Sequence, residues 1–267
     1  MYIKCEYGEM PLMVIAIGNQ KGGIGKSTTA QAIGAGYAIL RGYRVLMVDL
    51  DPQSNLTIAT GVKRSNVKTT FDLLSKNIQA DAQSVVQPIG KNLDLMPAKN
   101  KLSEISDHLP KIGRYDVLKK ALKSVIGKYD LIILDTPPSL GDLTLNALMA
   151  ADRVIVPAQA DLFSLEAIKE LGDTIWAVRE YNKNLKIEGI LLTRYQSRNI
   201  LTRELTELIE ETSKVLKTKV FKCAIREAVA IKEAQAMRQD IFTYAPTSKV
   251  AKDYQKCLEE LGDIAKI

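Results

Sequence analysis

A glycine-rich segment directly after an apolar run limits the possible folds more than any other feature of the chain. The apolar run covers 12–18 and predicts a strand, and a helix is expected from residue 26. Glycines let the backbone approach phosphate oxygens closely, and their N–H groups together with the start of the helix form an anion site. A strand, a phosphate loop and a helix in this order predict a nucleotide-binding α/β unit. The loop residues are Lys21, Gly22, Gly23, Ile24, Gly25, Lys26, Ser27 and Thr28.

The loop departs from the usual G-x-x-x-x-G-K-[ST] pattern, because Gln20 replaces the first glycine and Lys21 adds a second lysine. We expect Lys26 to reach the β- and γ-phosphates of a nucleotide. The Ser27 hydroxyl is expected to ligate Mg²⁺. A glycine-rich turn without a ligand is the alternative interpretation of this segment.

Three carboxylates follow strand-like runs, where a nucleotide site of this kind needs them. Asp49 lies near the end of the run 44–50 and Asp51 follows it directly, and Asp135 ends the run 130–135. Ligands of doubly wound sheets lie beyond the carboxyl ends of the strands. We expect Asp135 to hold Mg²⁺ through a water molecule. Taken singly, each aspartate also fits a helix cap or a turn.

The pattern along the whole chain predicts an α/β fold with a doubly wound, mainly parallel sheet and helices on both faces. Near-continuous Val/Ile/Leu runs are typical of strands covered on both sides. We expect a short extension over 1–11 and one domain over 12–267. The expected strands are 12–18, 44–50, 93–97, 130–135, 153–157, 187–193 and 219–223, and the expected helices are 26–41, 114–127, 143–151, 165–182, 201–216 and 248–261.

Composition narrows the class of protein without identifying it. The net charge is +6, from 37 basic and 31 acidic residues, which permits a polyanionic partner. The three cysteines are widely spaced and predict neither a disulfide framework nor a metal site. No apolar run is long enough to span a bilayer, and the N-terminus is too polar for a secretory signal. We therefore expect a cytoplasmic protein.

Together, the loop, the Asp49-Leu50-Asp51-Pro52-Gln53 segment and the Asp135-Thr136-Pro137-Pro138 segment resemble the deviant Walker A ATPases of the ParA/Soj partition family. The resemblance extends from about residue 13 to the C-terminal helix. It implies a P-loop ATPase that uses ATP and Mg²⁺, with Lys26 and Lys21 in the catalytic set. Lys21 would reach the partner's phosphates across a nucleotide-bound homodimer. Asp51 would position the attacking water, and Asp49 and Asp135 would support the metal.

The same resemblance implies a role in plasmid or chromosome partition. ATP would drive dimerisation and non-specific DNA binding on the nucleoid, and a ParB-like centromere-binding protein would stimulate hydrolysis. The residues expected to bind DNA are Arg198, Lys222, Arg226 and Lys232, from a basic stretch over 196–232. A solvated helix surface is the alternative explanation of this stretch.

A spatial regulator that positions a protein cluster or a membrane complex, as MinD-type proteins do, is the alternative function. Its membrane-bound members need a basic amphipathic C-terminal helix. Here Val250, Tyr254, Leu258 and Leu261 form an apolar stripe that we assign to the core, so no stable membrane association is expected. Trp176 is likewise expected in the core. His108 is expected in a loop without a metal role.

Overall fold

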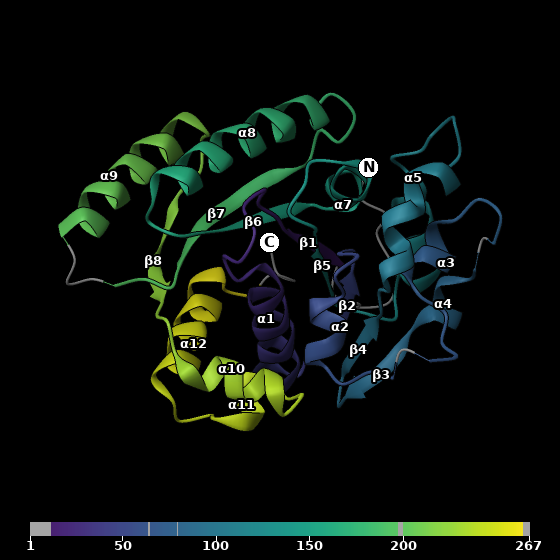
Figure 1. Ribbon diagram of the computed structural model, residues 1–267, viewed down its shortest axis with the longest axis horizontal. Helices are drawn as coiled ribbons and strands as arrows, with labels where there is room; N and C mark the ends of the chain where they lie inside the picture. Colours follow the sequence, from purple (N-terminus) through teal and green to yellow (C-terminus); the bar gives the residue numbers. More distant parts are fainter. Residues whose placement is uncertain (1–11, 64, 79, 197–199, 264–267) are drawn as a thin grey trace.

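The part of the chain that the structure describes contains one sheet of eight strands. The computed structural model describes residues 12–63, 65–78, 80–196 and 200–263. In these residues the strand order is β3-β4-β2-β5-β1-β6-β7-β8, and only β3 pairs in the antiparallel sense (Figure 1). The strands are β1 Met13–Ile17, β2 Val45–Asp49, β3 Gln87–Gly90, β4 Leu93–Met96, β5 Leu131–Asp135, β6 Arg153–Ala158, β7 Lys186–Thr193 and β8 Val220–Ile225.

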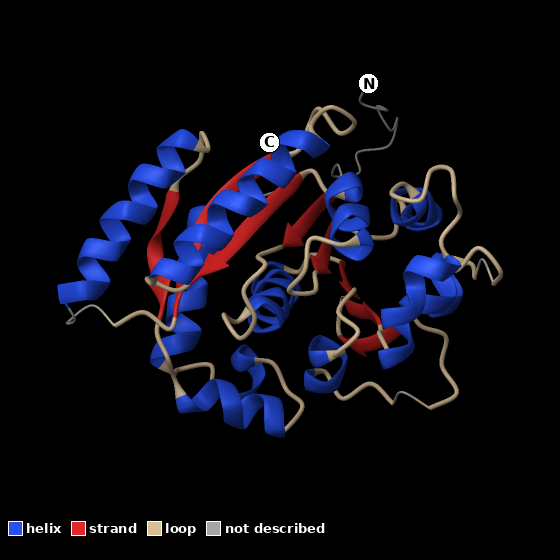
Figure 2. Cartoon of the chain, turned by 45° about the horizontal axis from the view of Figure 1, so that its top comes forward, coloured by secondary structure: helices blue, strands red, loops and turns tan. Residues whose placement is uncertain are grey.

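Helices cover both faces of the sheet, and each face has its own apolar core (Figures 1 and 2). One face is covered by α3 Thr70–Leu74, α4 Ala82–Val85, α5 Ile105–His108, α6 Val117–Leu122, α7 Asp142–Ala150, α8 Leu162–Val178 and α9 Ile200–Val215. The other face is covered by α1 Lys26–Arg41, α2 Asn55–Ala59, α10 Val229–Ala236, α11 Ile241–Tyr244 and α12 Lys249–Leu261. The expected doubly wound α/β fold is thus confirmed.

The central strands bring the acidic residues of the predicted site together. Every residue of β2 and β5 is buried, in keeping with their continuous apolar sequences. The register pairs Asp135 with Asp49 on one side and with Ile17 of β1 on the other. Because β1 leads directly into the glycine-rich loop, both carboxylates lie beside the phosphate loop at the carboxyl edge of the sheet.

Several local expectations were wrong. Strand β3, which contains Pro88 and has no apolar run, was not predicted. The helix expected over 114–127 is limited to α6 and a 3₁₀ turn, Lys123–Val125. His108 ends the one-turn helix α5 and packs edge-on against Phe71, so it does not lie in a loop.

Trp176 is also a correction, because 65% of it is exposed. Ile168, Leu171 and Ile175 form the buried side of α8, and Trp176 follows one position later on the outer side. A step of one residue turns a helix by about 100°, which removes the indole from the core. The C-terminal stripe on α12 is buried as expected.

Candidate nucleotide site

The phosphate loop has the backbone geometry that its glycines allow. Gly23 and Gly25 have φ values of 73° and 88°, in the left-handed region that favours glycine. Gly25 is the N-cap of α1, so the loop ends where the positive end of the helix begins. An adjoining cavity of about 350 Å³ is lined by this loop and by residues of α2, among others. A phosphate chain in this cavity would meet backbone N–H groups and the helix start together.

Lys26 is buried at this loop. Its Nζ donates a hydrogen bond of 2.9 Å to the backbone oxygen of Lys21. Burial lowers the pKa of Lys26, while the nearby Asp135 and Asp51 carboxylates oppose that shift. An ammonium group in this position can pair with a phosphate oxygen. The negative charge of the phosphate would then compensate for the loss of water around the buried ammonium.

Asp49 is fully buried and has several hydrogen bonds. Its Oδ2 accepts from the amide of Thr57 at 2.9 Å and from the Thr57 hydroxyl at 2.6 Å, and its Oδ1 accepts from the amide of Asp51. Burial raises the pKa of Asp49 to about 6, although these hydrogen bonds act in the opposite direction. Asp51 is also buried, and its Oδ1 accepts from the amide of Gln53 at 2.9 Å.

Asp135 is buried without such support. Among the described residues, neither of its carboxylate oxygens has a partner with full hydrogen-bond geometry. Burial raises the pKa of Asp135 well above its usual range and Asp49 adds to this, whereas Ser27 and Lys26 act in the opposite direction. A buried carboxylate without hydrogen bonds is unfavourable unless a ligand supplies positive charge or donors.

These residues fit a magnesium ion bound together with a nucleotide. No group of three or more His, Cys, Asp or Glu side chains that could hold a metal alone occurs in the described part of the chain. Mg²⁺ commonly keeps several waters and uses phosphate oxygens with one or two protein ligands. Ser27 and Asp135 offer such ligands, directly or through water. Asp49 is better suited to orienting the surrounding water, because its oxygens already accept three hydrogen bonds.

Lys21 does not line the phosphate cavity of its own chain. Its Nζ forms a salt bridge with Asp161, the N-cap residue of α8, and lies 3.5 Å from the Ser164 hydroxyl. The ammonium also lies 5.9 Å from the centre of the Phe163 ring. The lysine is therefore held at the start of α8, at the edge of the site, although it belongs to the phosphate loop.

A second cavity, of about 180 Å³, lies next to the first. Arg194 and Gln235 line both cavities, and the second also contains Ile225 and Tyr254. The Gln235 side-chain amide donates to the Thr28 hydroxyl at 3.0 Å, so α10 is tied to the phosphate loop. The position of this cavity beside the phosphate cavity suits the nucleoside half of a nucleotide.

Comparison with known proteins assigns the family. Residues 12–187 match the AAA domain family. The sporulation initiation inhibitor protein Soj of Bacillus subtilis is 40% identical over 253 residues, which cover 93% of this chain and 98% of Soj. The chain belongs to the ParA/Soj family of P-loop ATPases. It is therefore an ATPase, as the loop and its carboxylates indicate.

Solved structures of related proteins agree with this assignment. A putative plasmid partition protein of Borrelia burgdorferi B31 bound to AMPPNP is 26% identical, with a TM-score of 0.77 over 96% of this chain and 100% of that protein. Cobyrinic acid a,c-diamide synthase of Mycobacterium smegmatis with bound ADP and magnesium is 34% identical. Its TM-score is 0.74, with 85% of this chain and 91% of that protein covered. Both of these structures contain a bound nucleotide or nucleotide analogue, in keeping with the cavities described above.

The residues that the ParA/Soj resemblance assigns to DNA have different settings in the structure. Arg198 lies outside the described residues. The guanidinium of Arg226 forms hydrogen bonds of 2.6 and 2.8 Å with the buried carboxylate of Asp253. Arg226 and Lys232 also line the second cavity. Lys222 is exposed on β8, and its amide donates to Glu260 at 2.9 Å.

Sequence reasoning missed three residues of the site. Asp161 contacts Lys21 across 140 positions, and its only local signal is that of a helix N-cap before α8. Thr57 holds Asp49 from the short helix α2, and Gln235 contacts the loop from α10. Neither Thr57 nor Gln235 belongs to a sequence motif that we recognised. Their roles follow from packing between elements that the motifs do not define.

Proposed function

We propose that this protein is a ParA-type partition ATPase, in which ATP binding drives homodimerisation and non-specific DNA binding. A ParB-like protein bound at a centromere would stimulate hydrolysis and release the DNA. The observation that carries the proposal is the placement of the two loop lysines. Lys26 lies at its own phosphate cavity, whereas Lys21 is held at the edge of the site by Asp161. A lysine in that position is available to the nucleotide of a second copy.

The hydrolytic step uses the residues at the carboxyl edge of the sheet. The loop amides and Lys26 would bind the phosphates of ATP. Ser27 and Asp135 would hold Mg²⁺, which would supply positive charge next to the phosphate oxygens. Asp51 lines the phosphate cavity and orients the attacking water. Phosphoryl transfer depends mainly on such positioning and charge neutralisation. The chain over 12–267 acts as one ATPase domain in this scheme.

The start of α8 supports the proposed dimer. Leu162 and Phe163 are 65% and 74% exposed, although both are large apolar side chains. They follow Asp161 directly, so an apolar surface lies beside the Lys21 ammonium. A second copy placed here would bury these side chains and bring its triphosphate close to Lys21. ATP occupancy would then control dimerisation, because the triphosphate attracts the lysine.

Dimerisation would also create the DNA-binding surface by doubling the basic residues of each copy. Binding to phosphates needs clusters of Lys and Arg but no base recognition, and its affinity falls steeply with salt. Lys222 and Lys232 are exposed, and Arg226 is half-exposed despite its pairing with Asp253. These residues, with Arg198, are proposed to contact DNA, and the ATP-bound dimer would be found on the nucleoid.

Binding to a random-sequence DNA duplex tests the proposal, measured with ATP, with ADP and without nucleotide over a salt series. We expect salt-sensitive binding with ATP only. Lys26→Ala should abolish it through loss of nucleotide binding, and Asp51→Ala should trap the DNA-bound dimer. DNA binding that is equal in all three nucleotide states would contradict the proposal.

The same samples distinguish the alternative function. None of the helices in the described ranges is long and apolar enough to cross a membrane. Pelleting with anionic liposomes would nevertheless reveal a peripheral association. ATP-dependent binding to liposomes but not to DNA would replace the partition proposal with a MinD-like positioning role.

A further inference from the structure

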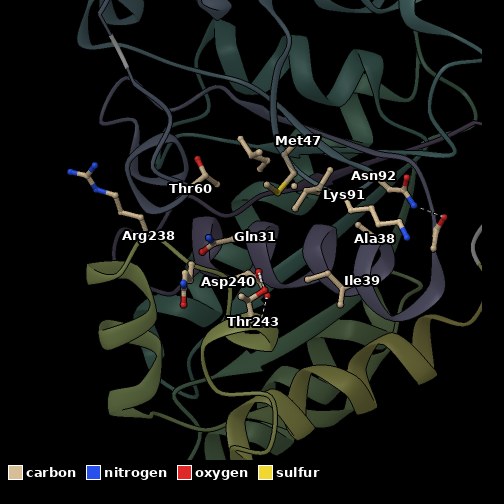
Figure 3. A pocket seen from close by; sticks show the side chains of 15 residues that line it. Gln31, Ala38, Ile39, Met47, Thr60, Lys91, Asn92, Arg238, Asp240 and Thr243 are labelled. Carbon is tan, nitrogen blue, oxygen red and sulfur yellow. Dashed lines mark hydrogen bonds between the residues drawn. The ribbon is translucent and has the colours of Figure 1, made fainter.

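A second groove, distinct from the nucleotide site, runs along α1. It has a volume of about 560 Å³ and lies between α1, the β3–β4 hairpin and the loop that joins α10 to α11 (Figure 3). Thr60 at the end of α2 closes one end, and Gly42 at the end of α1 lies at the other. The proposed partition mechanism assigns no role to this α1 groove.

The floor of the α1 groove is apolar. Its lining includes the buried residues Ala38, Met47 and Leu93, and the apolar surface that faces solvent comes from Ile39, which is 48% exposed, and from the half-buried Ile89. Solvent-exposed apolar surface in a concave site is unfavourable when nothing covers it. The floor therefore suits an occupant with apolar side chains.

Two cations stand at the ends of this floor. Figure 3 places Arg238 and Lys91 on opposite sides of the groove. Within the described residues neither side chain forms a salt bridge. Asp240 also lines the groove, but its carboxylate already accepts hydrogen bonds from the Phe242 and Thr243 amides and from the Thr243 hydroxyl. Among the described residues, the groove lining therefore carries two cations, Lys91 and Arg238, against one carboxylate, Asp240, whose oxygens are held by α11.

The Arg238 side chain is held by its own packing. Its residue has a φ of 56°, and its aliphatic part lies over Gly61. A Cβ at Gly61 would lie 3.1 Å from the Arg238 Cβ, a distance shorter than usual for such atoms. The absence of a side chain at Gly61 therefore allows the aliphatic part of Arg238 to pack against the backbone. This contact limits the rotamers of Arg238, so that binding of a ligand would cost less side-chain entropy.

We propose that the α1 groove binds a short, extended acidic segment of a partner protein. From Gln31 to Gly42 the groove follows about 16 Å of helix. An extended chain covers this length in about five residues. Carboxylates near both ends of the segment would pair with Arg238 and Lys91, and apolar side chains between them would cover the floor. A second copy of this chain is less suitable, since its net charge is +6.

Selection from a random seven-residue peptide library displayed on phage tests this inference, with the full-length, nucleotide-free protein as the target. The selection is repeated on the double variant Lys91→Glu/Arg238→Glu, and the enriched peptides are synthesised for fluorescence anisotropy. We expect wild-type selection to enrich peptides with two acidic residues four to five positions apart and apolar residues between them. Their affinity should fall at least tenfold in the double variant.

The matched control is Lys169→Glu/Lys183→Glu, which makes the same charge change at two exposed lysines on and after α8, away from the groove. Its peptide affinity should stay within about twofold of wild type, and thermal denaturation verifies that both variants fold. An equal loss in both variants would show a general charge effect and overturn the proposal. Enrichment of no acidic peptide would also overturn it, as would a random DNA duplex that competes with the peptides for the groove.

Discussion

Asp130 and Asp135 lie at the two ends of strand β5, and both are buried, yet their surroundings are opposite. Asp130 precedes the strand and forms a salt bridge of 2.6 Å with Arg44, whose backbone amide also donates to it at 2.8 Å. Burial alone would raise the pKa of Asp130, but the hydrogen bonds and charge of Arg44 outweigh it and lower the pKa. For Asp135, burial and Asp49 raise the pKa instead.

The difference separates a carboxylate that is paired within the chain from one that we propose pairs with Mg²⁺ and nucleotide. The charge of Asp130 is balanced within the chain, so its contribution to stability is present without nucleotide. Neither carboxylate oxygen of Asp135 has a partner with full hydrogen-bond geometry among the described residues. Burial of this charge therefore lowers the stability of the nucleotide-free protein. Such a cost is expected where binding energy from Mg²⁺ and nucleotide offsets it.

The largest expected effect comes from replacing each carboxylate in turn. Asp135→Asn should lower ATP hydrolysis at least about 100-fold, because the metal loses a ligand. The same change should raise the free energy of unfolding of the nucleotide-free protein by about 1–3 kcal/mol at pH 7.5. Asp130→Asn should lower that free energy by about 1–2 kcal/mol and leave hydrolysis within about twofold. Phosphate release and urea denaturation measure the two quantities.

Loss of stability in Asp135→Asn comparable to that in Asp130→Asn would contradict the comparison. It would show that Asp135 supports the fold as well as the metal. Addition of Mg²⁺ and ATP provides the control, since ligand should stabilise wild type more than Asp135→Asn.

The second prediction concerns pH and Asp49. Its pKa of about 6 in the folded protein lies above the ordinary value of 3.8, so the folded state binds more protons between these values. Stability from this group is therefore present at about pH 4 and is lost as the pH rises through about 6. The free energy of unfolding of Asp49→Asn, relative to that of wild type, should therefore rise by roughly 3 kcal/mol from about pH 4 to about pH 6. Above this interval the difference should stay constant.

Urea denaturation of both proteins from pH 4 to pH 8 measures this difference. The slope with pH is the informative quantity, because Asp49→Asn also disturbs the hydrogen bonds from Thr57 by a constant amount. A difference that does not change with pH would mean that Asp49 titrates as an ordinary carboxylate. The contrast with Asp130 predicts no such gain for Asp130→Asn, whose pKa shift has the opposite sign.

A smaller effect is expected at Asp161, where a loop lysine is paired within the chain. Asp161→Asn removes the charge that holds Lys21 but can still accept the hydrogen bond from the Ser164 amide that caps α8. The pair is partly exposed, so its loss is worth about 0.5–1 kcal/mol. The ATP concentration for half-maximal dimerisation should fall about two- to fivefold, as measured by sedimentation velocity.

Lys21→Ala is the control for this variant, since it should abolish the ATP-dependent dimer rather than favour it. An unchanged dimerisation midpoint in Asp161→Asn would mean that the salt bridge does not compete with the partner's phosphates. In that case Asp161 would act as a helix cap only.

How much the sequence could predict follows from the range of the interactions. The loop, the start and end of α1 and the position of Asp135 beside the loop were predictable, because strand, turn and helix signals are local. The pairing of Lys21 with Asp161 was not, since it depends on how β6 and α8 pack beside the loop. Arg226 illustrates the same limit: its basic character was evident, but its buried partner Asp253 comes from another element.

The smallest expected effect tests the same principle on helix α8, where adjacent residues have opposite surroundings. Ile175 is fully buried and Trp176 is 65% exposed. Trp176→Ala should change the free energy of unfolding by less than about 0.5 kcal/mol. Ile175→Ala should lower it by about 2–4 kcal/mol, because it leaves a cavity in the core. Urea denaturation compares the two. A decrease of more than about 1 kcal/mol in the free energy of unfolding of Trp176→Ala would indicate that the indole packs in the core, as its sequence pattern predicts. A smaller decrease would agree with its position one residue beyond the buried side of α8.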